Sequence, residues 1–303
     1  MKNEIEEDNL IKKRKIEFQD IMANIPKSVI NKLYYNKSEN SLILYNNNFQ
    51  ENLKLNDVEY TLNIMGNKSI KKLTIDGIFT EENDNNYEEL LTIINNKYQD
   101  LEELTMSNFL NPLFTKSLSI LKSKIYLNLK KITFSHCNLN EIDSLCSFLN
   151  RSRMNIQHLD LSDCWNMNRC SHHTFFPIID IVYPRLETLI LNRIKWNIHT
   201  MANDIDTIKL IQEKAKKVFN RMWFLFPQLQ NLEIIDAKLL NTTNSHIILS
   251  NSLSENNRRL KTLAFSPHFN KNSNKEREIE LLSSYINSFY ASTLPFHVFL
   301  PCY

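Results

Sequence analysis

Cysteine and histidine side chains gather in one stretch of the chain, and their types could bind a metal ion. They are Cys164, Cys170, His172 and His173, with His136 and His158 earlier in the chain. Thiolate and imidazole groups are the common ligands of zinc, but structural zinc sites place them at characteristic spacings. The spacing C-x5-C-x-H-H is not one of these. We therefore expect no bound metal and no other cofactor.

Motifs of enzymatic chemistry do not occur in the sequence. It contains no G-x-S-x-G, H-E-x-x-H or C-x-x-C motif. Its 303 residues include only two glycines, Gly66 and Gly77, which argues against the glycine-rich loops that bind phosphate groups. We therefore expect a protein that is not an enzyme.

The composition of the chain indicates which compartments and which classes of partner to expect. The formal net charge of +2 gives no field that by itself indicates nucleic acid or a charged membrane as a partner. No apolar run approaches the roughly 18 residues needed to span a bilayer. The five cysteines follow no signal peptide, so a reducing compartment, the cytoplasm or the nucleus, is expected.

Repeated sequence units are the elements that we expect to position the polar side chains of this chain. The stretch 129–139 matches the L-x-x-L-x-L-x-x-N/C-x-L signature of a leucine-rich repeat at every defined position. In such a unit a short strand points Ile132 and Phe134 into the core, while the residues between and beside them face outward. Cys137 and Cys164 occupy the Asn/Cys position, where the side chain caps backbone groups at the turn. That position explains both cysteines without a metal.

The signature recurs along the chain in one register. Seven full copies begin at Ile70, Leu101, Leu129, Ile156, Leu186, Leu229 and Leu260. Their core pairs are Leu73/Ile75, Leu104/Met106, Ile132/Phe134, Leu159/Leu161, Leu189/Leu191, Leu232/Ile234 and Leu263/Phe265, preceded by a weaker copy with Leu42/Leu44. A unit of this kind cannot bury its apolar face alone, so successive units must stack.

The segments between these strands have apolar residues at intervals of three and four, which predicts amphipathic helices. The predicted helices cover 55–65, 87–94, 142–149 and 175–182, with a longer one over 205–226 and a closing helix over 279–289. Strand, turn and helix in units of about 30 residues resemble the repeats of ribonuclease-inhibitor-like and F-box-associated proteins. The resemblance implies a curved α/β leucine-rich repeat solenoid, with an inner parallel sheet of about eight strands and helices on the convex side.

The N-terminal region carries a separate motif. Ile25-Pro26-x-x-Val29-x-x-x-Leu33 resembles the core of F-boxes and the cullin-contacting box of VHL-type receptors, both of which precede leucine-rich repeats in substrate receptors of cullin-RING ubiquitin ligases. The resemblance implies that these four residues, on a short helix, contact a ligase adaptor or cullin. The alternative is that they only cap the open end of the solenoid. We expect a helical segment over 1–38 and a repeat domain with a C-terminal capping helix over 39–303.

Outward positions of the predicted strands are free to vary and form the candidate binding surface for a protein partner. They are Lys72, Thr74, Asp76, Glu103, Thr105, Ser107, Lys131, Thr133, Ser135, His158, Asp160, Ser162, Thr188, Ile190, Asn192, Asn231, Glu233 and Ile235. This set lacks the aromatic and arginine side chains on which nucleic-acid bases stack. The expected function is a protein–protein interaction module, a monomer on its own, acting as a ubiquitin-ligase substrate receptor. The alternative is a scaffold or inhibitor-like binder without a ubiquitin link.

Overall fold

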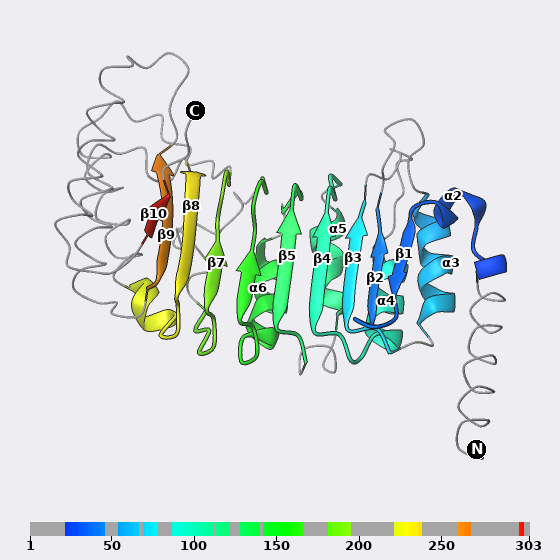
Figure 1. Cartoon of the computed structure of the whole chain (residues 1–303), viewed down its shortest axis with the longest axis horizontal. Helices are drawn as coiled ribbons and strands as arrows, with labels where there is room; N and C mark the ends of the chain where they lie inside the picture. Colours follow the sequence, from blue (N-terminus) through cyan, green and yellow to red (C-terminus); the bar gives the residue numbers. More distant parts are fainter. Residues whose placement is uncertain are drawn as a thin grey trace, which may run out of the picture.

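A single mixed sheet with helices on one face organises the chain (Figure 1). The computed structural model describes residues 22–45, 54–66, 69–77, 87–111, 113–121, 128–139, 142–165, 181–194, 221–237, 260–267 and 297–299. The ten strands follow one another across the sheet in sequence order. Every neighbouring pair is parallel except β1 and β2, which are antiparallel.

The strands are short and the helices are placed between them in the chain. The strands are β1 (Leu33–Asn36), β2 (Ser41–Leu44), β3 (Lys72–Asp76), β4 (Glu103–Ser107), β5 (Lys131–Ser135), β6 (His158–Asp160), β7 (Thr188–Ile190), β8 (Asn231–Ala237), β9 (Thr262–Pro267) and β10 (His297–Phe299). The helices are α2 (Lys27–Ile30), α3 (Leu55–Met65), α4 (Tyr87–Lys97), α5 (Leu113–Ser117), the 3-10 turn η1 (Leu118–Ile120) and α6 (Ile142–Ser152). Residues 221–225 are also helical.

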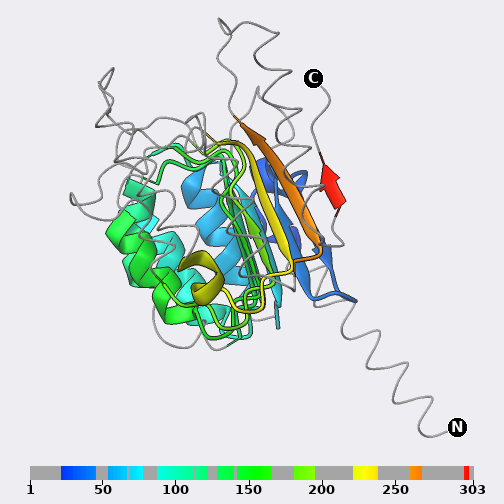
Figure 2. The same ribbon diagram turned by 90° about the vertical axis from the view of Figure 1, so that its left-hand side faces the viewer.

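Two layers result from this alternation. Figure 2, which looks along the stack of strands, shows the sheet as one layer and helices α3, α4 and α6 as a second layer on one side of it. In the described part of the chain, the connections from β2 to β6 each contain a helix of the second layer, as parallel neighbours need a crossover. None of the helices in the described ranges is long and apolar enough to cross a membrane.

The predicted core register is confirmed. The first core residues of successive units are direct cross-strand partners: Leu42, Leu73, Leu104, Ile132, Leu159, Leu189, Leu232 and Leu263. All of them are buried, as are the seven first-position residues from Ile70 to Leu260. Because side chains alternate along a strand, this register places every intervening residue on the opposite face of the sheet.

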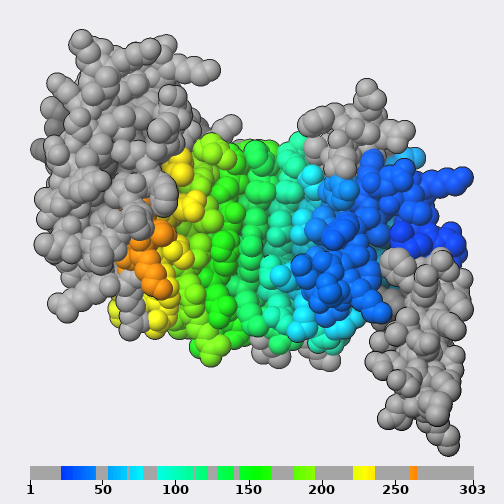
Figure 3. Space-filling view, viewed as in Figure 1, coloured from blue at the N-terminus to red at the C-terminus, as the bar shows by residue number. Residues whose placement is uncertain are grey.

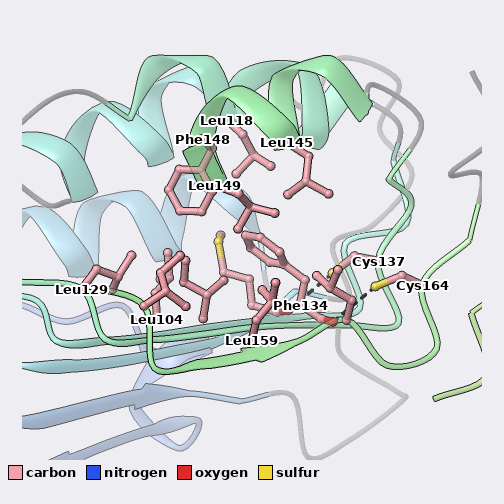
Figure 4. Close-up of a cluster of buried hydrophobic side chains, with 14 of the residues drawn as sticks. Leu104, Leu118, Leu129, Phe134, Cys137, Leu145, Phe148, Leu149, Leu159 and Cys164 are labelled. Atoms are coloured by element: carbon pink, nitrogen blue, oxygen red, sulfur yellow. Dashed lines mark hydrogen bonds between the residues drawn. The ribbon is translucent and has the colours of Figure 1, made fainter. Parts of the chain in front are cut away.

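Aromatic and aliphatic side chains fill the space between the two layers. Figure 4 shows Phe134 of β5 facing Leu145, Phe148 and Leu149, which come from α6. The ring centroids of Phe134 and Phe148 lie 6.1 Å apart. The predicted stripes of α3 and α4 are buried against the same core. Burial of apolar side chains between the two layers is the main favourable contribution to folding.

The sheet has two strands more than the eight that the repeats predict. Strands β2–β9 are the eight predicted ones, while β1 and β10 extend the two ends of the sheet. The expected helix through Leu33 is wrong, because α2 ends at Ile30 and Leu33 begins β1. The Oδ1 atom of Asn36 accepts bonds from the backbone N and the Oγ of Ser38, and Asn40 has a φ of 50°. These contacts turn the chain back into a hairpin with β2.

The expected boundary at residue 38 therefore falls within this hairpin, and residues 22–45 together form one end of the sheet. At the other end, His297–Phe299 forms β10, which pairs with β9. The closing helix expected over 279–289 lies outside the described residues.

Ile181 and Val182, the last two residues of the helix predicted over 175–182, are not helical, and 175–180 lie outside the described residues. Val182 is exposed, whereas Ile181 and Tyr183 on either side of it are buried. The next residue is Pro184, whose ring disfavours helical conformation in the residue before it. The stripe predicted over 175–182 therefore does not continue through Val182.

Candidate interaction face

The side of the sheet opposite the helices, which we call the open face, carries the predicted outward residues. Figure 3 shows this face across the middle strands, with strands β3–β8 side by side. One row across it is Lys72, Glu103, Lys131, His158, Thr188 and Asn231, and the next row is Thr74, Thr105, Thr133, Asp160, Ile190 and Glu233. Asp76, Ser107 and Ser135 form a third row. All of these side chains are half-buried, so the structure brings the predicted set together on one surface.

Ser162, Asn192 and Ile235 extend the third row, although Ser162 and Asn192 follow the ends of β6 and β7. The backbone N of His136 donates to the carbonyl of Ser162 at 3.1 Å. The backbone N of Ile235 donates to the Oδ1 of Asn192 at 2.9 Å. These bonds link neighbouring units beyond the regular strands.

Charges alternate between neighbouring strands at the start of β3, β4 and β5. On the open face the Nζ of Lys72 lies 3.0 Å from the Oε1 of Glu103. At the edge beside it, Glu102 accepts bonds from Lys71 and Lys130, each at 2.7 Å. Hydrogen bonds from Lys130 and Lys71 hold the pKa of Glu102 well below its usual value, at about 2. These pairs are solvent-exposed, so each adds little to stability and they act mainly on the pattern of charge.

Small hydroxyl side chains form the centre of the open face. Threonines 74, 105 and 133 are aligned across β3, β4 and β5, and serines 107 and 135 follow them in the next row. Short side chains leave the backbone layer accessible to a long side chain of a partner. The centre of the open face therefore consists of short hydroxyl side chains beside the charged edge.

Polar contacts hold the side chains of the later strands in place. The Oδ1 atom of Asp160 accepts bonds from the backbone N and the Oγ of Ser162, at 2.9 and 2.6 Å. The Nδ2 of Asn192 donates to the Oε2 of Glu233 at 3.0 Å. Each carboxylate therefore has one oxygen engaged and a fixed orientation.

His158 lies between charges of both signs. Burial and the neighbouring Lys131 lower the pKa of His158, while Asp160, Glu233 and Glu103 act in the opposite direction. The imidazole is therefore mainly neutral at pH 7.

Sequence reasoning missed a polar rim at the ends of the strands. Asp163 accepts two bonds from the guanidinium of Arg193, at 2.5 and 2.6 Å, and lies 3.5 Å from the Nε2 of His136. His136, Asp163 and Arg193 all have positive φ, as does Asn108 in the preceding unit. The available signal was their common position, two residues after the last core residue of each strand.

An exposed tyrosine at the first end of the open face was also missed. Tyr34 of β1 is a direct partner of Ile43 of β2, and about half of its surface is exposed. The expectation of a helix through Leu33 concealed the period-two alternation that would have predicted it.

The buried cysteines act as caps, as the repeat position predicts. The Sγ of Cys137 donates to the carbonyl of Met106, and the Sγ of Cys164 donates to the carbonyl of Phe134 at 3.3 Å (Figure 4). Burial raises the pKa of the Cys164 thiol. In the described ranges no group of Cys, His, Asp and Glu side chains is arranged to hold a metal. Cys170, His172 and His173 lie outside those ranges.

The N-terminal box faces the core. Ile25 and Val29 are buried, with Val29 0 % exposed, and Leu33 is half-buried and packs against the same cluster. Pro26 precedes the first residue of α2 and is half-buried. The Oγ of Ser28 donates to the carboxylate of Asp57 in α3 at 2.5 Å, which ties α2 to the helical layer. The cap interpretation requires burial of both Val29 and Leu33, and Leu33 meets this requirement only in part.

One buried carboxyl group lies in the helical layer. Glu59 of α3 has only 7 % of its surface exposed, and its Oε1 has no hydrogen-bond partner. Burial, with repulsion from Glu89, raises the pKa of Glu59 to about 7, although a backbone hydrogen bond from Leu90 opposes the shift. Its position behind the sheet separates it from the open face.

No protein-family model matches the chain, and no curated protein sequence matches it. Function is therefore inferred from the geometry of the open face and of residues 25–33.

Proposed function

We propose that the chain is a leucine-rich repeat solenoid that binds a protein partner through the open face. The L-x-x-L-x-L register supports the repeat assignment, because eight successive units place equivalent residues as cross-strand partners. The helices lie on one side of the sheet, as in a solenoid whose sheet lines the inner surface.

The observation that carries the functional proposal is the composition of the open face. Its rows contain half-buried threonines, serines and charged residues, and several of the charged residues bond to polar neighbours in the same or the next unit. Protein interfaces combine such polar contacts with a few apolar positions, here Ile190 and Ile235. The role is binding rather than catalysis.

Residues 25–33 act in this proposal as a cap. An adaptor-binding helix must offer an apolar face to its partner, whereas Ile25 and Val29 are already packed into the core. The simpler role, a repeat scaffold or inhibitor-like binder, is therefore favoured over a ubiquitin-ligase receptor. A cytoplasmic or nuclear location remains part of the proposal.

A substitution in the centre of the open face tests the proposal. Thr133→Arg places a long cation among the short hydroxyl side chains at the centre of the open face, and Thr92→Arg places the same side chain on the exposed surface of α4. Both full-length variants should keep the wild-type melting temperature. Quantitative mass spectrometry of co-purifying proteins should show partners lost with Thr133→Arg and retained with Thr92→Arg. Equal partner recovery from the two variants would overturn the proposal.

A further inference from the structure

Three charged side chains on strands β5, β6 and β8 of the open face lack an opposite charge among the described residues, as does Asp76 on β3. Lys72 is paired with Glu103, but Lys131, Asp160 and Glu233 make no ion pair within the part of the chain that the structure describes. A half-buried charge without a counter-charge costs free energy that a partner of opposite charge can offset. These three residues are therefore places where a partner can gain electrostatic complementarity.

The two carboxylates flank an apolar side chain in one row. Asp160, Ile190 and Glu233 are successive cross-strand partners on β6, β7 and β8. Two strand spacings separate the outer residues by about 9.6 Å between Cα atoms. The side chains of Asp160 and Glu233 can therefore reach one group placed over Ile190.

One oxygen of each carboxylate is hydrogen-bonded within the chain, and the second oxygen can accept a bond from a partner. Ser162 bonds the Oδ1 of Asp160, and Asn192 bonds the Oε2 of Glu233. In the described structure, Asp160 Oδ2 and Glu233 Oε1 accept no bond, so each carboxylate is oriented by one oxygen and open at the other. Fixed acceptors of this kind lose little entropy when a donor binds.

We infer that Asp160, Ile190 and Glu233 form a seat for a lysine or arginine side chain of the protein partner, with Lys131 beside it matching an acidic group. The aliphatic stem of the partner side chain lies on Ile190 and its charged head reaches both carboxylates. This inference rests on the proposed function of the open face and specifies the chemistry of the partner there.

The charge of the whole face favours this partner over an anionic one. The predicted outward set contains two lysines, Lys72 and Lys131, and four acidic residues, Asp76, Glu103, Asp160 and Glu233. The excess of two negative charges opposes a polyanion such as nucleic acid, which needs clustered lysine and arginine. The Cα atoms of Asp160 and Glu233, about 9.6 Å apart, also lie within roughly one Debye length, so the attractions of the two residues for one cation add.

Peptide selection against the intact protein tests the seat. Random peptides displayed on phage are selected against the full-length wild-type chain, and those whose binding is blocked by Thr133→Arg are kept as probes of the open face. We expect these probes to be enriched in lysine or arginine. The Kd of a synthetic probe should rise at least ~10-fold in the double variant Asp160→Asn, Glu233→Gln, because each substitution keeps the shape and removes the charge.

A control variant and a second variant of the seat make the result specific. Glu187→Gln removes an exposed carboxylate one residue before β7 and should leave the Kd unchanged. Ile190→Ser should weaken binding, since it removes the apolar support. The melting temperature of each variant should remain that of the wild type.

The outcomes separate this inference from the proposed function. Probes that Thr133→Arg blocks but the double variant binds with unchanged Kd, or that are rich in acidic residues, overturn the seat and leave the open face as the binding surface. A selection that yields no peptide blocked by Thr133→Arg counts against both.

Discussion

At the scale of single residues, adjacent side chains on β5 differ in environment because they point to opposite faces of the sheet. Ile132 is fully buried, whereas Thr133 is half-exposed on the open face. Ile132→Ala should therefore lower the free energy of unfolding by about 2–5 kcal/mol, the usual range for a buried large-to-small change. Thr133→Ala should change it by no more than ~0.5 kcal/mol. Urea denaturation of both variants measures the difference, and equal losses would mean that the register is wrong.

Glu59 predicts a specific pH dependence of stability. Its pKa is raised from 4.5 to about 7 in the folded state, so the folded protein binds the proton more tightly than the unfolded chain does. The stability contributed by the protonated carboxyl is present below pH 4.5 and is lost as the pH rises through 7. Compared with wild type, Glu59→Gln should gain in melting temperature as the pH rises from 5 to 7. Parallel curves for the two proteins would contradict the assignment.

His158 reports the charges around the proposed seat. Burial and Lys131 lower its pKa, whereas Asp160 and Glu233 raise it. NMR titration should give His158 a pKa below 6.5, a lower pKa still in Asp160→Asn, and a higher pKa in Lys131→Met. An unchanged His158 pKa in Asp160→Asn would show that the carboxylate does not approach the imidazole.

At the scale of elements, α2 closes one end of the sheet. Val29 has no exposed surface, so Val29→Asp would bury an unpaired charge and should lower the free energy of unfolding by at least ~2 kcal/mol. Asn31→Asp adds the same charge at an exposed position one residue beyond α2 and should have little effect. Thermal unfolding of the two variants distinguishes them. An unchanged melting temperature for Val29→Asp would restore the adaptor-binding interpretation.

The repeat units were predictable from sequence because the same physical requirement acts on each of them. Every unit must bury a first-position residue and two strand residues, so the pattern that predicted Leu104 and Met106 also predicted Leu232 and Ile234. The open face then followed from side-chain alternation alone.

The two ends of the sheet were not predictable in the same way. Strand β1 has no repeat signature, and it depends on the turn bonds of Asn36 and on pairing with β2. Strand β10 has no full repeat signature either. For the candidate site, the sequence predicted which residues face outward but not which would pair. The bond between Asn192 and Glu233 joins residues 41 apart, which only the packed structure brings together.

At the scale of the whole molecule, the two sides of the sheet differ in the kind of side chain that they carry. The helices bury the apolar side of the sheet, and the cap closes its first end. The opposite side keeps an ordered row of charged and hydroxyl groups whose identities can vary without altering the fold. The buried and outward positions alternate along each strand, so in the proposed solenoid the residues that stabilise the fold differ from those available to bind a partner.

Site-specific photo-crosslinking measures most directly whether the open face is the binding surface. A photoreactive amino acid is introduced at Thr105, in the centre of the open face, or at Thr92, on the exposed side of α4. Irradiation of cells that express each full-length variant, followed by mass spectrometry, identifies the crosslinked proteins. If the open face is the binding surface, we expect protein crosslinks from position 105 and none from position 92. Crosslinks from position 92 with none from position 105 would contradict it.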